Sequence, residues 1–315
     1  MNWKTGSFAE NKVRGLDKDE FEIVARQTLN EDDLAAIRDL EGLCSQHDGI
    51  RLKLNWDIIT DRKPGSNDDF LCFDKNGVLA GYLAVFCFGG TEAEISGMVD
   101  PSYRRKGIFS VLLGQAIEEM RARNIRSMLF INDRGSASGT EFIKASGAVF
   151  DHSEHLMELP GDMEPVKVTS PVGFRKAVQD DLELLAGMDS ICFNTSVEES
   201  RAFYNEVWLD CQGHQGSAVN TQMFIVVAEG KDIGMIRLST EKDDILIYGF
   251  GIKPEYRGLG YGRAALGLAV NMALSKGPSH VALEVDCVND TALSLYRSCG
   301  FTTKCTYDYY RVSID

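Results

Sequence analysis

The chain has 315 residues, and its 33 basic and 47 acidic side chains give a net charge of −14. Nucleic acid and anionic membranes repel a surface this acidic, so we expect neither as a partner. A hydrophobic content of 44% and a charged content of 25% are typical of a soluble globular protein, and the length allows two domains. The segment from Met1 to Ser7 lacks the apolar core of a signal peptide, which favours a cytoplasmic location.

The eight cysteines and five histidines are scattered, without the spacing of a metal site or a Cys-x-x-Cys pair. We therefore expect mostly reduced thiols in core or strand positions and no bound metal. A disulfide between Cys287 and Cys299 is the alternative that this spacing leaves open.

The first half alternates between strand-like and helix-like segments. Asn30 precedes apolar residues at helical spacing up to Leu43, which predicts a capped helix. The Asn76-Gly77 pair predicts a tight turn between two strands. Strands are expected at Phe21–Arg26, Phe70–Phe73, Val78–Phe88, Glu94–Val99, Ser127–Ile131 and His155–Leu159, and further helices at Ser110–Arg123 and Thr140–Ala145.

The second half repeats this order after residues 161–171, where glycine and proline indicate a linker. Strands are expected around Phe174 and at Gln222–Glu229, Ile233–Ser239, His280–Asp286 and Thr302–Val312, and helices at Asp180–Met188 and Val197–Trp208. An apolar strand ends at Pro254, and a helical pattern begins soon after it and runs to Leu274.

A glycine-rich turn separates that strand from that helix and reads Arg257-Gly-Leu-Gly260-Tyr-Gly262-Arg263. The first turn of a helix carries unpaired N–H groups and the positive end of the helix dipole, and glycine permits close approach. The turn is therefore a candidate seat for a pyrophosphate, and a turn without a ligand is the alternative. No Lys-Ser or Lys-Thr follows, which excludes a Walker loop, and Arg263 stands where a Rossmann fingerprint needs glycine.

Two motifs carry a resemblance to a known family. Arg257-x-x-Gly260-x-Gly262 resembles the coenzyme A loop of the GNAT (GCN5-related) N-acetyltransferases. Downstream, the segment Asn289-x-x-Ala-x-x-x-Tyr296-x-x-x-Gly-Phe is similar to the second signature of that family. The spacing between the two motifs also resembles the family pattern.

An internal repeat relates the two halves. Residues 153 positions apart match in Pro101 and Pro254, Tyr103 and Tyr256, Arg104 and Arg257, Gly107 and Gly260, and Gly147 and Gly300. We therefore expect two tandem GNAT domains, at 1–160 and 172–315, joined by a linker at 161–171, with 1–19 as a possible extension. The resemblance implies an α/β fold in which each domain has a mostly antiparallel central sheet flanked by helices.

The two copies differ at the motif positions. The first has Phe109, Ile143 and Ser136 where the second has Gly262, Tyr296 and Asn289. We interpret the first domain as a degenerate copy that helps to shape the acceptor pocket and has a possible second cofactor site. That site would comprise Val99, Arg104, Arg105, Lys106, Gly107, Ile108 and Phe109; solvated surface charges are the alternative for the three cations.

The resemblance implies an N-acetyltransferase that moves the acetyl group of acetyl-CoA to a primary amine by direct attack, in the second domain. It implies cofactor contacts at Phe250, Gly251, Ile252, Arg257, Gly258, Leu259, Gly260, Tyr261, Gly262, Arg263, Asn289 and Tyr296. Tyr296 would protonate the leaving thiolate. An alkylamine has a pKa near ~10, so a base or a water chain must deprotonate it, and Glu284 is the first candidate before Asp244 and Glu241.

The tandem architecture is similar to that of the mycothiol synthases, which acetylate a cysteinyl amine. This similarity does not extend to a substrate pocket, so a small molecule or a peptide amine is expected without a more specific choice. A non-catalytic acetyl-CoA-binding, sensing or interaction module is the main alternative, and hydrolysis or transfer of a longer acyl group is another. A monomer is favoured because tandem duplication often replaces a dimer.

Overall fold

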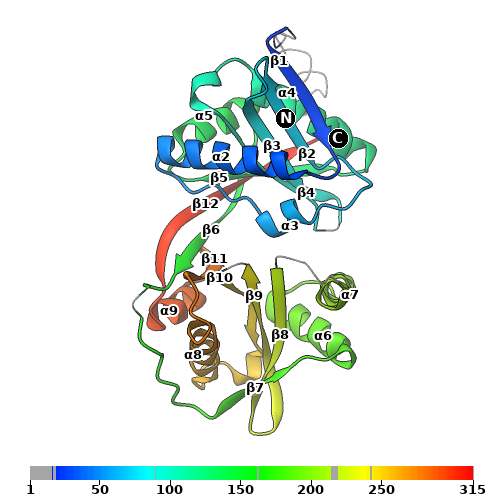
Figure 1. Cartoon of the computed structure of the whole chain (residues 1–315). Coiled ribbons are helices and arrows are strands. Elements are labelled where there is room, and N and C mark those ends of the chain that lie inside the picture. Colours follow the sequence, from blue (N-terminus) through cyan, green and yellow to red (C-terminus); the bar gives the residue numbers. More distant parts are fainter. Residues whose placement is uncertain are drawn as a thin grey trace. The chain divides into compact units, whose positions relative to one another are not determined.

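A computed structural model describes Leu16 and residues 19–88, 90–161, 163–213, 219–241 and 243–314. The chain forms two compact units, each drawn in Figure 1. The first comprises Met1–Glu154 with Cys305–Asp315, and the second comprises His155–Lys304. The extension expected at 1–19 lies almost entirely outside the described residues.

The first unit is built on a mixed sheet. Its strands are β1 (Phe21–Arg26), β2 (Asp69–Asp74), β3 (Leu79–Phe86), β4 (Glu92–Val99) and β5 (Ser127–Asp133), and its helices are α2 (Glu31–Asp48), α3 (Trp56–Thr60), α4 (Ile108–Ala122) and α5 (Ala137–Ser146). The pairing is antiparallel except between β4 and β5, which are parallel. The expected strands and helices are confirmed, whereas the short helix α3 was not predicted.

Helices cover both faces of this sheet (Figure 1). Leu112 and Met120 of α4 pack with Ile143 of α5 on one face, and Ile37 and Leu40 of α2 pack on the other. All five side chains are buried. The helix α2 begins after Asn30 as predicted, because the Asn30 side chain accepts a hydrogen bond from the backbone N–H of Asp33.

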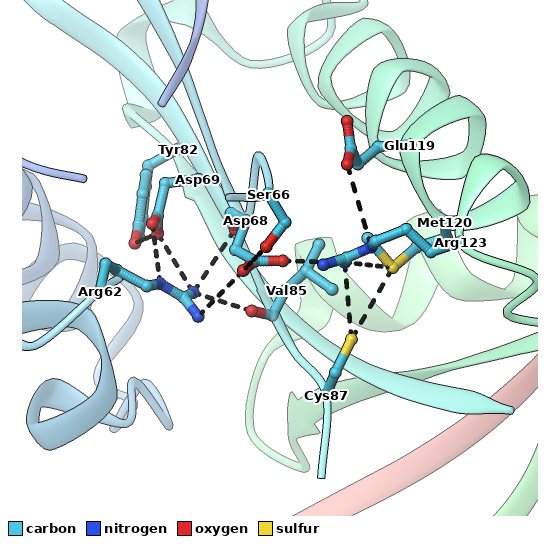
Figure 2. Close-up of polar contacts among 10 residues, drawn as sticks. All are labelled: Arg62, Ser66, Asp68, Asp69, Tyr82, Val85, Cys87, Glu119, Met120 and Arg123. Carbon is cyan, nitrogen blue, oxygen red and sulfur yellow. Dashed lines mark hydrogen bonds and ion pairs between the residues drawn. The ribbon is translucent and has the colours of Figure 1, made fainter. Parts of the chain in front are cut away.

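A buried ionic cluster fixes the segment after α3 to the sheet (Figure 2). Arg62 donates from Nε to Asp69 at 2.8 Å and from Nη2 to the carbonyl oxygen of Val85 at 2.8 Å. Tyr82 donates its hydroxyl to Asp69 at 2.6 Å. Asp69 and Tyr82 are fully buried, and burial raises the pKa of Asp69. Every member of this cluster has a partner within the unit, which is the arrangement that a structural role requires.

The second unit repeats the architecture. Its elements are β7 (Val172–Lys176), α6 (Leu182–Phe193), α7 (Val197–Gly213), β8 (Val219–Ala228), β9 (Lys231–Glu241), β10 (Asp244–Ile252), α8 (Tyr261–Leu274), β11 (His280–Asp286) and α9 (Asp290–Ser298). Each of the strands β7 to β9 pairs antiparallel with the next strand in sequence, and β10 pairs parallel with β11. One hydrophobic cluster joins the sheet to α8 and α9, and another joins its opposite face to α6 and α7 (Figure 1).

The closing strands depart from the predicted domain bounds of 1–160 and 172–315. Strand β6 (Val149–Glu158) contributes its residues from His155 onward to the second unit, where it neighbours β11. Strand β12 (Thr302–Ser313) contributes its residues from Cys305 onward to the first unit, where it pairs with β5. The two halves therefore exchange strands. Sequence order predicts that a strand exists, but it does not predict which sheet the strand joins.

The segment expected to be a linker packs on the second unit. Asn271 of α8 accepts a hydrogen bond from the backbone N–H of Val166 at 2.8 Å and donates one to its carbonyl oxygen at 2.9 Å. A Cβ atom at Gly267 would come within 3.0 Å of the Val166 side chain, so glycine there allows the close contact. Residues around Val166 are thus part of the packed structure of this unit.

Candidate coenzyme A site

The sheet of the second unit opens between β10 and β11. Their parallel pairing runs from Asp244 and His280 to Ile247 and Leu283 and ends there, although both strands continue. The backbone of β10 beyond Ile247 therefore lies outside this ladder, and its polar groups need other partners. A ligand that enters the opening meets backbone donors and acceptors directly.

A β-bulge lies in β10 at the same point. The register with β9 passes from Tyr248 opposite Arg237 to Gly251 opposite Met235, so three steps along β10 match two along β9. Gly249 within the bulge has a φ of 54°. A bulge leaves one residue out of the ladder and redirects its polar groups, and bulges are common beside active sites.

The glycine-rich turn leads into α8 with its first N–H groups uncapped. Gly260 is the N-cap residue, with a φ of 84° and no side-chain cap hydrogen bond, whereas Asn289 caps α9 with its side chain. A Cβ atom at Gly258, where φ is 77°, would have no neighbour within 4 Å, so the turn is open to an approaching group. These features fit a diphosphate, because uncapped N–H groups and the helix dipole attract anions.

The side chains of this turn have distinct positions. Arg257 donates from Nε to the carbonyl oxygen of Ile252 at 2.8 Å and so ties the turn to the end of β10. Tyr261 donates its hydroxyl to Glu229, whereas Leu259 and Arg263 are exposed. The predicted anion site is therefore brought together mainly through the backbone of the turn.

Tyr296 and Asn289 lie on α9. Tyr296 is 9% exposed, packs edge-on against Phe301 at 6.2 Å and shares the hydrophobic cluster of Ile252. Burial raises the pKa of Tyr296 to about 12. Asn289 accepts a hydrogen bond from the backbone N–H of Ala292 at 3.1 Å and thereby starts the helix that carries the phenol.

The candidate bases lie apart from Tyr296. Val281, Leu283 and Val285 of β11 belong to the cluster beneath α8, so Glu284 between them projects to the opposite face of the sheet. Asp244 pairs with His280 at the start of β10, and Glu241 lies opposite it on β9. Asp244 and Glu241 therefore lie beside the start of β10, far from the turn that follows its end. Of the three candidate bases, Glu284 alone lies where the sheet opens.

The first unit keeps an equivalent opening. Pairing of β4 with β5 ends at Ile95 and Phe130, and a cavity of about 1090 Å³ occupies the region beyond. Its walls include Gly97 and Val99 of β4 and the turn at Gly107. Gly107 caps α4 with a φ of 89° and no side-chain hydrogen bond, so this helix start is also uncapped.

The three cations of this first turn have partners within the unit. Arg104 donates both terminal nitrogens to Asp48 at 2.8 and 2.7 Å and its Nε to the carbonyl oxygen of Val99 at 3.0 Å. Lys106 lies over the rings of Phe21 and Tyr103. Exposed Arg105 lies 3.6 Å from Glu141. An anion here would be held chiefly by backbone N–H groups.

The first unit lacks the bulge. Its β3–β4 register is continuous from Gly81 opposite Val99 to Phe86 opposite Glu94. The last residue pair of each parallel ladder shows the difference. Phe130 and Leu283 are separated by the repeat interval of 153 residues, whereas Ile95 and Ile247 are separated by only 152. Strand β10 therefore holds one residue that β4 lacks, and Gly249 is that residue.

Phe109 stands where the second unit has Gly262, and a glycine on the neighbouring strand makes room for its ring. Its ring lies 2.8 Å from where a Cβ atom of Gly97 would be, and Gly97 corresponds to Phe250 in the second unit. The first unit thus has glycine on the strand and phenylalanine on the helix, and the second unit has the reverse. Gly262 needs no special backbone angle, and a Cβ there would find only ordinary contacts at 3.6 Å or more. The missing glycine therefore does not by itself disable the first loop.

Sequence reasoning missed Gly249 and Arg237. Arg237 is 8% exposed, and its guanidinium lies within 2.4 Å of where a Cβ atom of Gly249 would be. The available signal was a lone arginine inside the apolar strand segment Ile233–Leu238. Only the register of the strands reveals that the two residues meet.

The described ranges contain no group of three or more side chains suited to a metal ion. None of the helices described is long and apolar enough to cross a membrane. Within the same ranges, no disulfide joins Cys287 and Cys299, so that alternative is wrong.

Comparison with known proteins agrees with this geometry. The acetyltransferase (GNAT) family model matches residues 34–138 and again residues 188–301. The mycothiol acetyltransferase of Thermomonospora curvata is 26% identical over 297 residues, covering 90% of this chain and 95% of its own. That of Clavibacter michiganensis is 23% identical, covering 71% and 72%.

Solved structures share the fold. A GCN5-related N-acetyltransferase from Sphaerobacter thermophilus superposes with a TM-score of 0.76 at 19% identity, over 95% of this chain and 97% of its own. A tandem GNAT protein from the clavulanic acid biosynthesis pathway gives 0.71 at 16% identity, over 94% and 99%. The chain is therefore an acyltransferase-class enzyme of the GNAT family, with two GNAT domains in tandem.

Proposed function

We propose that this enzyme transfers the acetyl group of acetyl-CoA to the primary amine of a small molecule or peptide, and that the second unit performs the reaction. The observation that carries this proposal is the bulge at Gly249, which the first unit lacks. It lies where the sheet opens, on the strand whose end, at Ile252, shares a hydrophobic cluster with Tyr296.

The relatives support acetyl transfer but not one acceptor. The mycothiol acetyltransferases of Thermomonospora curvata and Clavibacter michiganensis align with 90% and 71% of this chain, at 26% and 23% identity. We therefore propose a small amine acceptor and leave mycothiol precursors as one candidate within that class.

Acetyl-CoA supplies an acetyl group activated as a thioester. In the proposal, the N–H groups of the turn from Gly258 to Arg263 hold its diphosphate, and the backbone from Phe250 to Ile252 holds the pantetheine arm. Arg257 positions the turn by its bond to Ile252. The unpaired backbone of the bulge donates to the thioester oxygen as negative charge develops there.

Two proton transfers complete the reaction. The amine nitrogen forms a bond to the acetyl carbon and loses a proton to Glu284, directly or through water. As the carbon–sulfur bond breaks, the thiolate receives a proton from the phenol of Tyr296. A thiol has a pKa of about 8.5, so transfer from this buried phenol, whose pKa is about 12, needs the proton to move as the bond breaks.

A second, non-catalytic function is favoured for the first unit. Its cavity of about 1090 Å³ lies at an opening and an uncapped helix start like those of the second unit. Ile143 stands at the position that corresponds to Tyr296, so the first unit has no phenol there. We propose that residues Val99 to Phe109 bind acetyl-CoA without turnover.

Calorimetric titration with acetyl-CoA tests the assignment. We expect binding to the whole chain, with one site lost when Gly260 is changed to tryptophan. Release of thiol on adding a panel of primary amines would then establish transfer. Absence of any acetyl-CoA binding would contradict the coenzyme A assignment of both turns, and binding without thiol release for any amine would favour a sensing or interaction module.

A further inference from the structure

Arg237 of β9 is a buried cation with unsatisfied donors. It is 8% exposed, and neither Nε nor Nη1 has a hydrogen-bond partner in the described part of the chain. Buried arginine normally pairs with a carboxylate or carbonyl oxygen, because an unpaired buried charge destabilises the fold. The described residues therefore leave two guanidinium nitrogens without an acceptor, and a group from outside these residues would have to supply it.

The surroundings of Arg237 are aromatic. The guanidinium carbon lies 4.7 Å from the ring centroid of Phe203, 5.3 Å from that of Tyr204 and 4.7 Å from that of Tyr248. These rings stabilise a cation but accept no conventional hydrogen bond through their faces. They hold the guanidinium in place and leave its N–H groups for another acceptor.

The nearby carboxylate of Asp189 is already engaged. It accepts hydrogen bonds from Thr195 at 3.2 Å, Ser200 at 2.9 Å and Tyr204 at 3.2 Å. Asp189 thus positions α7 and one of the rings around Arg237, while its own acceptor capacity is largely used by hydroxyl groups.

Arg237 lies beside the bulge that we assign to the acetyl-transfer reaction. It lies opposite Tyr248 at the bulge, and its guanidinium occupies the space that a side chain at Gly249 would need. Met235, two residues before it, belongs to the cluster under α6 and α7, whereas Ile236 and Leu238 belong to that under α8. Arg237 therefore lies on the face opposite α8, away from the helix start that suits a diphosphate.

The first unit has no counterpart. Ala84 pairs with Ser96 on β4 as Arg237 pairs with Tyr248 on β10, and Ala84 is fully buried. The buried cation and the bulge thus occur together in the unit to which we assign the reaction, and both are absent from the same strands of the other unit.

We infer that the acceptor amine carries a carboxylate, which Arg237 binds beside the bulge. This inference rests on the proposed function and specifies its substrate class as amino acids or short peptides with a free carboxylate near the reacting amine. The carboxylate supplies the missing acceptors and neutralises the buried charge. Arg237 is then a specificity-determining residue, and the amine of the same molecule is directed to the opening.

The test compares acceptors that differ only in charge. Probes are α-, β- and γ-amino acids and dipeptides, each matched with its carboxamide, and the readout is thiol release from acetyl-CoA with the full chain. We expect the carboxylate member to be favoured by about 10- to 100-fold in kcat/KM, in line with a charge-assisted hydrogen bond at a buried site. In Arg237→Gln this preference should fall to near 1 while acetyl-CoA affinity is unchanged.

Two outcomes would overturn the inference. One is equal use of acid and amide by the wild type; the other is a lack of turnover with every carboxylate probe in protein that binds acetyl-CoA. In both cases the calorimetric binding of acetyl-CoA shows that the coenzyme A assignment itself survives. Absence of acetyl-CoA binding would instead defeat the proposed function.

A ligand-free measurement separates recognition from support of the fold. Arg237→Met replaces the unpaired charge with an apolar side chain of similar length, and we expect its Tm to equal or exceed that of the wild type. Loss of carboxylate preference with a maintained Tm supports a binding role. A fall in Tm of more than about 4 °C, corresponding to roughly 1 kcal/mol or more in a chain of this size, would show a structural cation and overturn the inference.

Discussion

The two units have the same sheet opening and the same turn, but the side chains and the strand register around them differ. In both, parallel pairing stops before the strand ends, an arginine ties the turn to the preceding strand, and the following helix starts at an uncapped glycine. Among the described residues, only the second unit has the bulge at Gly249, the phenol of Tyr296 and the buried Arg237. The comparison teaches that the backbone proposed to bind coenzyme A is kept in both units, whereas the side chains proposed for the reaction are not.

The backbone of the first turn persists even at an energetic cost. Arg105 has a φ of 66° where the second unit has Gly258 at 77°. A side chain in this left-handed region costs roughly 1 kcal/mol or more relative to glycine. The paired bonds of Arg104 to Asp48 and to Val99 hold the turn in this form.

Among substitutions that leave the glycine-rich turn intact, the largest effect is expected from Tyr296→Phe. Removing the hydroxyl should lower kcat by about 100- to 1,000-fold, because it deletes the proposed proton donor to the thiolate. Steady-state turnover and calorimetry on the same protein measure this, and the Kd for acetyl-CoA should change by less than about 3-fold. The matched variant Ile143→Val in the first unit should leave kcat unchanged. Equal kcat in wild type and Tyr296→Phe would remove the phenol from the mechanism.

The pH dependence of the wild type tests the same group. Because burial raises the pKa of Tyr296 from about 10 to about 12, its phenol stays protonated between pH 7 and 10. We expect no loss of kcat from its ionisation in that range, since the protonated form is the donor. An alkaline fall with a midpoint below pH 10 that Tyr296→Phe abolishes would contradict this assignment.

A smaller loss is expected from Gly249→Ala. A Cβ atom there would lie 2.1 to 2.4 Å from guanidinium atoms of Arg237, so the bulge must shift. Displacement of the bulge by about 1 Å should lower kcat by about 100-fold or less. Gly97→Ala is the control in the first unit, where the Cβ atom would lie 2.6 Å from the carbonyl oxygen of Tyr82. If both variants lost turnover equally, the bulge would have no special role.

The smallest effect concerns the turn of the first unit. Arg105→Gly relieves a left-handed backbone, so we expect the free energy of unfolding to rise by about 1 kcal/mol. The exposed contact of Arg105 with Glu141 contributes little against this. The reverse change, Gly258→Arg, should destabilise the second unit by a similar amount. Denaturant unfolding measures both, and a destabilised Arg105→Gly would indicate that the arginine side chain matters more than its backbone.

Local patterns in the sequence predicted most of the elements. Asn30 and Asn289 start helices as their cap chemistry indicates, and the pair Asn76-Gly77 forms the turn between β2 and β3. The repeat interval located both turns because each is a contiguous motif. These features depend on neighbours in sequence, which is why the sequence reveals them.

Long-range register explains what the sequence did not predict. The exchange of β6 and β12 depends on which sheet edge each strand meets, and the extra residue Gly249 is visible only when the two ladders are compared. The position of Glu284 on the face opposite Tyr296 follows from its neighbours Leu283 and Val285 being in the core beneath α8. The role of Arg237 likewise depends on packing between β9, β10 and α7.

The most direct test of catalysis by the second unit compares Gly107→Trp with Gly260→Trp. Both glycines start a helix with nearly the same φ, 89° and 84°, so the substitutions impose similar local strain. Thiol release from acetyl-CoA in the presence of amine acceptors is the measurement. We expect Gly260→Trp to abolish turnover and Gly107→Trp to retain at least half of it. Loss of turnover in Gly107→Trp with turnover retained in Gly260→Trp would place the reaction in the first unit and contradict the assignment.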